Sequence, residues 1–189
     1  MTVFLVRHGE TEWNRQRRYQ GWSDSPLTDR GIAQAEAIGR RLRTLPEAAA
    51  AEIVASPIGR AHRTAEIIAA CLGRSAPPRL DERLREISLG SWDGLNRVDI
   101  RSRMGAGFAE FEWYFRTPDG ESYDGFAERI AAWLEEQGDR PVIAVSHGVV
   151  TRVLRGLYAG LPRAEALRLA VPQDRIFRLA GGRIDEIAA

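Results

Sequence analysis

Short apolar runs rich in β-branched residues alternate along this chain with longer amphipathic stretches. The apolar runs predict strands at 3–6, 52–55 and 142–145, and a terminal hairpin at 176–179 and 183–187. The amphipathic stretches predict helices at 28–45, 60–72 and 123–137, and a further helix follows from 147 to about 158. This alternation predicts an α/β fold, in which a mostly parallel sheet carries helices on both faces.

The segment 95–115 interrupts the alternation. It is helix-prone and aromatic, with Phe108, Phe111, Trp113, Tyr114 and Phe115 close together. We therefore predict a short helical insertion that lies over the ligand-binding edge of the sheet. Its aromatic residues fit either packing within the insertion or contact with an apolar or planar part of a ligand. At 189 residues and 44% hydrophobic, residues 1–189 suit one domain.

Composition narrows the range of partners. A formal net charge of +1 gives no reason to expect a nucleic acid or an anionic membrane as partner, and no stretch approaches the roughly 18 apolar residues of a membrane-spanning helix. The single cysteine, Cys71, fits a reducing compartment, so we expect a cytoplasmic protein. Three histidines and one cysteine form no cluster with metal-ligand spacing, and we expect no metal and no cofactor. All 27 basic residues are arginine, and most of them, Arg17 and Arg18 included, are expected on the solvated surface.

Arg7-His8-Gly9 directly follows the first predicted strand. Open α/β sheets bind their ligands at the carboxyl ends of strands, where this tripeptide lies. His8 is a potential nucleophile beside the permanent cation Arg7, and Gly9 is expected to let the chain turn sharply. A neutral imidazole can attack phosphorus when a cation offsets the surrounding negative oxygens, and its other ring nitrogen should then donate to a backbone carbonyl. Taken alone, the tripeptide also fits a solvated strand end.

A second strand followed by His-Gly occurs at His147-Gly148, with Arg60 and Glu86 between the two units. Arg60 and Arg7 can bind phosphate oxygens in fork geometry. His147 opens a helix, so its imidazole and the helix N-terminus can both stabilise an anion. A carboxyl group such as that of Glu86 can protonate a leaving alcohol and later take a proton from water. These residues together predict a site for phosphoryl transfer.

Six stretches carry a resemblance to a known family: 5–14, 20–28, 56–65, 86–94, 120–122 and 146–148. Over them the chain resembles the histidine phosphatase superfamily, the phosphoglycerate-mutase-like proteins. The resemblance implies a phosphoglycerate-mutase-like fold, with His8 as nucleophile, Glu86 as general acid and base, and Arg7, Arg60 and His147 around the phosphate. It also implies a substrate-binding set, which is Arg7, Asn14, Gln20, Gly21, Arg60, Arg97 and Gly148. For Asn14, Gln20 and Gly21, helix capping and turn formation explain the residue types equally well.

The resemblance covers both phosphatases and mutases. The family's mutases hold phosphoglycerate with an adjacent arginine pair, which residues 112–116 lack, and this chain has Leu89 and Val149 where a mutase carries tyrosine and asparagine. Arg97 is the one match to the mutase pattern. We therefore expect a trimmed, less cationic cap and a phosphatase that hydrolyses a small-molecule phosphate ester through a phosphohistidine on His8. A cofactor-dependent phosphoglycerate mutase is the alternative, and a catalytically silent phosphate-ester sensor or partner-binding protein ranks below it. The substrate and the oligomeric state stay open.

Overall fold

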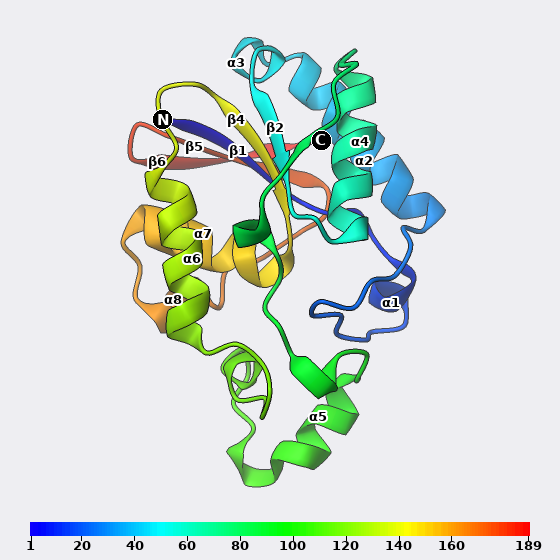
Figure 1. Cartoon of the computed structure of the whole chain (residues 1–189), viewed down its shortest axis with the longest axis vertical. Helices are drawn as coiled ribbons and strands as arrows, with labels where there is room; N and C mark the ends of the chain where they lie inside the picture. The colour runs from blue at the N-terminus through cyan, green and yellow to red at the C-terminus, as the bar shows by residue number, and fades with distance from the viewer.

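A six-stranded sheet forms the centre of the computed structural model, which describes residues 1–106 and 108–189 in full and Gly107 by its backbone alone. The strands are β1 (Thr2–Arg7), β2 (Glu52–Ala55), β3 (Arg79–Leu80), β4 (Val142–Ser146), β5 (Arg175–Ala180) and β6 (Arg183–Ala188). Their order in space is β3-β2-β4-β1-β5-β6 (Figure 1). Only the pairs of β5 with β1 and with β6 are antiparallel, so the predicted mostly parallel sheet with a terminal hairpin is confirmed.

Helices cover both faces of the sheet, as the alternating pattern predicts. The α-helices are α1 (Glu12–Arg15), α2 (Asp29–Arg43), α3 (Pro46–Ala49), α4 (Gly59–Cys71), α5 (Arg97–Met104), α6 (Tyr123–Glu135), α7 (Gly148–Ala159) and α8 (Arg163–Ala166). Short 3₁₀ helices are η1 (Glu82–Leu84), η2 (Gly90–Trp92), η3 (Gly105–Gly107) and η4 (Trp113–Phe115). Figure 1 shows α2 and α4 on one side of the sheet and α6 and α7 on the other. Among the helices of the described residues, none is both long and apolar enough to cross a membrane.

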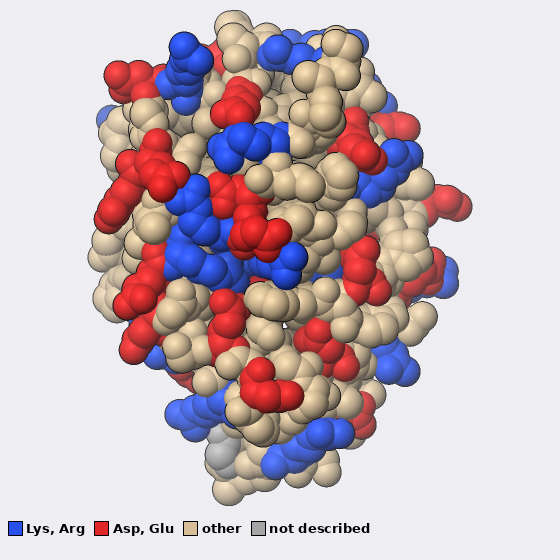
Figure 2. All heavy atoms as spheres, in the orientation of Figure 1, with Lys and Arg blue, Asp and Glu red and all other residues tan. Residues whose placement is uncertain are grey.

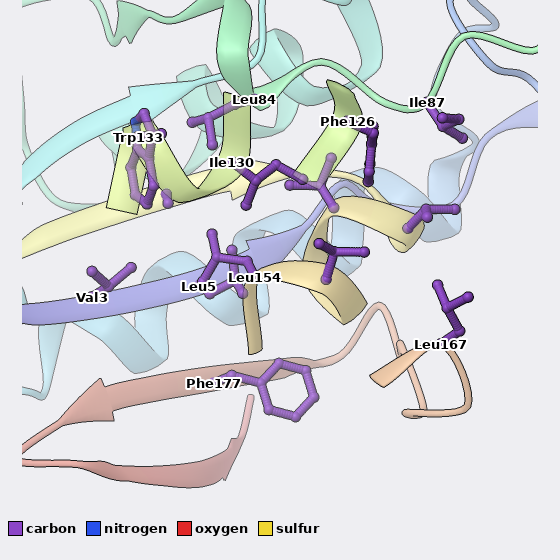
Figure 3. Packing of buried hydrophobic residues seen from close by; sticks show 14 of the residues in the cluster. Val3, Leu5, Leu84, Ile87, Phe126, Ile130, Trp133, Leu154, Leu167 and Phe177 are labelled. Atoms are coloured by element: carbon purple, nitrogen blue, oxygen red, sulfur yellow. The ribbon is translucent and has the colours of Figure 1, made fainter. Parts of the chain in front are cut away.

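The central strand β1 contributes to a hydrophobic core on each face of the sheet. Val3 and Leu5 pack with Ile130 and Trp133 of α6 and with residues of α7 (Figure 3). Phe4 and Val6 point the opposite way and pack against α2 and α4. Successive side chains of a strand alternate between faces, so a continuous apolar run suits a strand that is covered on both sides.

The insertion at 95–115 consists of α5 and the 3₁₀ turns η3 and η4, and α5 extends away from the sheet (Figure 1). Trp113 is only 2% exposed and packs edge-on against Tyr19, with ring centroids 4.6 Å apart. It also contacts Tyr114 at 4.3 Å between ring centroids. Packing within the insertion therefore accounts for Trp113.

Gly9 is required for a reason that differs from the expected one. Its φ is not positive, so a sharp turn does not demand glycine here. A Cβ at Gly9 would instead stand 2.2 Å from the carbonyl oxygen of Gly31 in α2, and a Cβ at Gly31 would stand 2.0 Å from the carbonyl oxygen of Glu10. The expectation of a turn glycine was wrong. The residue lets the loop after β1 lie directly against the first turn of α2.

Replacing Gly9 with alanine should lower the free energy of unfolding by about 1–3 kcal/mol, because the added methyl group would overlap backbone that cannot rotate away. Gly138→Ala is the matched control, since a Cβ there meets no atom within 4 Å. Its effect should stay within about 0.5 kcal/mol. Urea unfolding followed by circular dichroism measures both. Equal stability of the two variants would contradict the packing role of Gly9.

Candidate active site

The two strands that end in His-Gly are neighbours in the sheet. β1 and β4 pair in parallel with Arg7 opposite Ser146, so the residues that follow, His8 and His147, leave the sheet side by side. Their ring centroids are 5.3 Å apart. A pocket of about 460 Å³ opens at this edge, and it is lined by Arg7, His8, Asn14, Arg17, Arg18, Tyr19, Gln20, Gly21, Arg60, Glu86, Arg97, Tyr114, Gly148, Val149, Arg152 and Val171. The structure thus brings together all residues of the expected site: nine of them line the pocket, and the tenth, His147, is buried beside His8.

His8 is buried at the base of the pocket, with 2% of its surface exposed. Its Nδ1 lies 2.8 Å from the carbonyl oxygen of Gly9, and Nε2 lies 3.3 Å from Nε of Arg60. A carbonyl oxygen can only accept, so Nδ1 carries the proton and the lone pair is on Nε2. Burial, and then the positive charges of Arg60 and Arg7, hold the pKa of His8 well below its usual value. The imidazole is therefore neutral, with its basic nitrogen beside a cation.

His147 is wholly buried, and only one of its ring nitrogens has a partner. Nε2 lies 2.8 Å from Oγ of Ser56, which already accepts a hydrogen bond from the backbone N–H of Ile58. The Ser56 hydroxyl hydrogen can therefore go to Nε2, which leaves the His147 proton on Nδ1. Nδ1 is buried without a partner and could donate to an anion. Burial is the main reason that the pKa of His147 lies well below its usual value.

Arg60 does not present the open fork that the sequence suggested. Its Nη2 donates to the carbonyl of Gly21 at 2.8 Å and its Nη1 to that of Ser23 at 2.7 Å, while Nη1 also lies 3.4 Å from Oδ1 of Asp24. With Nε on His8, every nitrogen of the guanidinium has a protein partner. The loop after α1 therefore closes around the fork and uses most of its donors, and phosphate binding by Arg60 stays a prediction.

Arg7 is the more open of the two cations. Its Nη1 donates to the carbonyl of Val171 at 2.7 Å, but its Nε is buried without a partner. Burial lowers the pKa of Arg7 to about 10, so the guanidinium still carries its charge at neutral pH. An unpartnered buried N–H is costly, and a bound anion is one way to satisfy it.

Glu86 occupies the helix N-terminus that the sequence assigned to the phosphate. Its carboxylate accepts hydrogen bonds from the backbone N–H groups of Val149 at 3.2 Å and Val150 at 3.4 Å, at the start of α7. It also accepts from the N–H of Ile87 at 3.1 Å. The expected use of this helix end was thus wrong in detail: its dipole and first N–H groups hold the carboxylate in place beside the pocket.

Asn14, Gln20 and Gly21, the residues with two explanations, have structural contacts and also line the pocket. Asn14 closes the capping box of α1 with Thr11, and Gln20 accepts from the Thr11 hydroxyl at 3.1 Å, yet both line the pocket. Gly21 has φ +51° and its carbonyl binds Arg60. Arg97 lines the pocket but pairs with Glu110 at 3.0 Å.

Several lining residues were not expected from the sequence. They are Tyr19, Arg152 and Val171, together with Arg17 and Arg18, which are exposed as expected but also line the pocket. Tyr114 also lines it, in agreement with the alternative that the aromatic insertion contacts a ligand. Arg152 lies four residues after Gly148 in α7, so the helical spacing could have placed it on the same face. Gln173, which donates to the carbonyl of His8 at 3.1 Å and to Oδ1 of Asn14 at 3.0 Å, carries no local signal. Arginines from several segments line the pocket, and the expectation of a less cationic cap than in a mutase stays a prediction.

Comparison with known proteins identifies the family. The family model of the histidine phosphatase superfamily (branch 1) matches residues 3–182 of this chain. The chain belongs to the histidine phosphatase superfamily. Its resemblance to this superfamily and its phosphoglycerate-mutase-like fold are confirmed.

The proteins similar to this chain include one named as a phosphoglycerate mutase and one named as a phosphatase. The probable phosphoglycerate mutase GpmB of Salmonella arizonae is 39% identical over 95% of this chain and 84% of that protein. YhfR of Bacillus stearothermophilus has a TM-score of 0.82 at 34% identity, over 99% of this chain and 95% of that chain. A mycobacterial glucosyl-3-phosphoglycerate phosphatase in complex with VO3 has a TM-score of 0.79 at 30% identity, over 99% and 96% of the two chains. These similarities therefore do not decide between a mutase and a phosphatase, and the residues of the pocket must be considered.

The two buried histidines should make stability depend on pH. Their pKa values are lowered in the folded protein, so below about pH 6.5 the unfolded chain binds protons that the folded chain does not. The free energy of unfolding should therefore decrease as the pH falls from 7 towards 5. Urea unfolding at several pH values measures this slope, and His8→Gln or His147→Gln should each reduce it. Ile38→Val, a buried apolar change, should lower stability by about the same amount at every pH. An unchanged slope in both histidine variants would contradict the buried neutral state.

Proposed function

We propose that this protein hydrolyses small-molecule phosphate monoesters through a phosphohistidine formed on His8. The observation that carries the proposal is the state of His8 in the cationic pocket: its Nδ1 donates to the Gly9 carbonyl, so the lone pair lies on Nε2. That lone pair accepts from Arg60 Nε at 3.3 Å, a bond that must give way as phosphorus approaches. Such a nitrogen can attack phosphorus without bringing further negative charge into the site.

The proposed reaction has two steps. In the first, Nε2 of His8 forms a bond to phosphorus as the ester P–O bond breaks, and Glu86 gives its proton to the leaving alcohol oxygen. In the second, Glu86 takes a proton from a water that attacks phosphorus, and the P–N bond breaks to release inorganic phosphate. Glu86 is suitably placed because three backbone N–H groups fix its carboxylate at the pocket wall.

Positive charge around the phosphoryl group would come from Arg7 and Arg60. Arg7 offers its unpartnered Nε. Arg60 contributes its buried charge, and its Nε–H, which binds Nε2 of His8 in the structure, would turn to a phosphoryl oxygen once Nε2 bonds to phosphorus. His147 would donate from its unpartnered Nδ1. Fixed donors of this kind typically supply about 3 kcal/mol each to the stabilisation of a transition state.

His8→Ala should lower turnover of phosphate esters by at least about three orders of magnitude, because both steps pass through this residue. Rapid quenching of the wild-type enzyme at high pH, followed by peptide mass spectrometry, should locate acid-labile phosphate on His8. His62→Ala is the matched control, since His62 lies on α4 and does not line the pocket. It should leave turnover within a factor of two. Phosphate on His147 in place of His8 would reverse the assignment.

Phosphoryl transfer between positions of a phosphoglycerate is the second candidate, because Arg97 does line the pocket. Hydrolysis is favoured by Leu89 and Val149, which stand where a mutase carries tyrosine and asparagine. Leu89 is buried in the core and does not reach the pocket, and Val149 presents an apolar side chain there. A mutase must also exclude water while it holds the dephosphorylated product, and neither residue can hydrogen-bond such a product.

Incubation with 3-phosphoglycerate and catalytic 2,3-bisphosphoglycerate separates the two activities. We expect either release of inorganic phosphate or no reaction with this substrate, because Leu89 and Val149 offer no hydrogen bond to a retained intermediate. Phosphate is measured by colorimetry and 2-phosphoglycerate by coupled assay. Rapid formation of 2-phosphoglycerate without phosphate release would replace the phosphatase proposal with a mutase.

A further inference from the structure

The mouth of the pocket carries more positive charge than one phosphate monoester requires. Six arginines line the cavity, whereas Glu86 is the one carboxylate among the described residues that do so. Arg7 and Arg60 lie beside His8, where the phosphoryl group would be. Of the other four, Arg97 is neutralised by Glu110, but Arg17, Arg18 and Arg152 form no ion pair with a carboxylate among the described residues.

This excess is not a property of the surface as a whole. The formal net charge of the chain is +1, and Figure 2 shows basic side chains next to acidic ones over most of the visible face. Exposed arginines commonly pair with nearby carboxylates, as Arg63 does with Glu66 and Arg178 with Glu47. Cations without carboxylate partners in a concave site raise the local concentration of anionic ligands.

Arg152 is held in a fixed position at this mouth. It lies one helical turn after Gly148, its Nε donates to the carbonyl of Leu169 at 2.8 Å, and its guanidinium stacks on Phe111 at 4.7 Å from the ring centroid. Tyr114 lines the same cavity, and burial raises its pKa to about 12 against the opposing charge of Arg152, so the phenol stays protonated. Arg152 and Tyr114 therefore form a pre-positioned pair of hydrogen-bond donors that faces the cavity.

Backbone strain also concentrates at this mouth. In the described part of the chain, the non-glycine residues with positive φ are Arg17, at 57°, and Phe111, at 68°. Arg17 lines the cavity, and Phe111 carries the Arg152 guanidinium. Non-glycine residues persist in this conformation only where the surrounding structure enforces it, and such residues cluster at ligand-binding sites.

We propose that Arg152 and Tyr114, assisted by Arg17 and Arg18, bind a second anionic group of the substrate. The preferred substrates would then be phosphate monoesters that carry a carboxylate or a second phosphate beyond the scissile phosphoryl group. This inference rests on the proposed function, in which the first phosphoryl group lies at His8.

Two pairs of substrates test the proposal and show whether the second anion is a carboxylate or a phosphate. 3-Phosphoglycerate and glycerol 3-phosphate differ by a carboxylate, and fructose 1,6-bisphosphate and fructose 6-phosphate differ by a phosphate. In at least one pair, kcat/KM should be tenfold or more higher for the member with the second anion. Arg152→Gln should reduce that ratio at least fivefold. Arg183→Gln, which removes an exposed arginine of β6 outside the pocket, should leave the ratio unchanged.

Binding to the His8→Ala variant keeps this test independent of hydrolysis. Calorimetry with the same two pairs should give Kd ratios that favour the second anion, and adding Arg152→Gln should reduce them. If Arg152→Gln fails to fold by circular dichroism, Tyr114→Phe provides the smaller change, and it should lower the ratio about threefold. Ratios near one in both pairs, or ratios that neither variant alters, would overturn the proposal. Selective binding without hydrolysis by the wild type would preserve this subsite and reject the proposed function instead.

Discussion

The buried guanidinium of Arg60 is the interaction on which the site depends. It is 2% exposed and links its own helix, α4, to two other segments. It bonds His8 after β1, and the carbonyls of Gly21 and Ser23 in the loop after α1. A buried cation is tolerated only when its donors are satisfied, so the loop must close around it. Asp24 completes the enclosure by accepting the backbone N–H of Arg60 at 3.1 Å.

The same requirement explains why neighbouring residues are glycines. A Cβ at Gly59 would lie 2.1 Å from Oδ2 of Asp24, and a Cβ at Gly21 would lie 1.9 Å from Oδ1 of Asp93. The carboxylates of Asp24 and Asp93 therefore occupy the space that side chains at these two positions would need. This close packing holds the imidazole of His8 between its Gly9 and Arg60 partners, which keeps one nitrogen protonated and the other basic.

Arginine side chains also bind the segment 169–171, which contributes Val171 to the pocket. Consecutive carbonyls of Leu169, Ala170 and Val171 accept hydrogen bonds from Arg152, Arg155 and Arg7. A guanidinium has five N–H groups in a planar fork, so one side chain can secure a backbone carbonyl and still offer donors to a ligand. The wall of the pocket and its positive charge thus come from the same side chains. The near-neutral surface beyond it leaves the charge concentrated where a phosphate ester would bind.

The sequence by itself determined the alternation of strands and helices, the parallel character of the sheet and the meeting of His8 with His147. Apolar periodicity decides the first two, and two strands of the same kind that each end in His-Gly decide the third, because parallel neighbours end at one edge. Only the tertiary structure decided which groups surround them. The closure of the Arg60 fork, the capture of the α7 N-terminus by Glu86 and the bond of Gln173 to the carbonyl of His8 each join segments far apart in the chain. Such contacts follow from how separate elements pack in three dimensions, and no local pattern of residues encodes that arrangement.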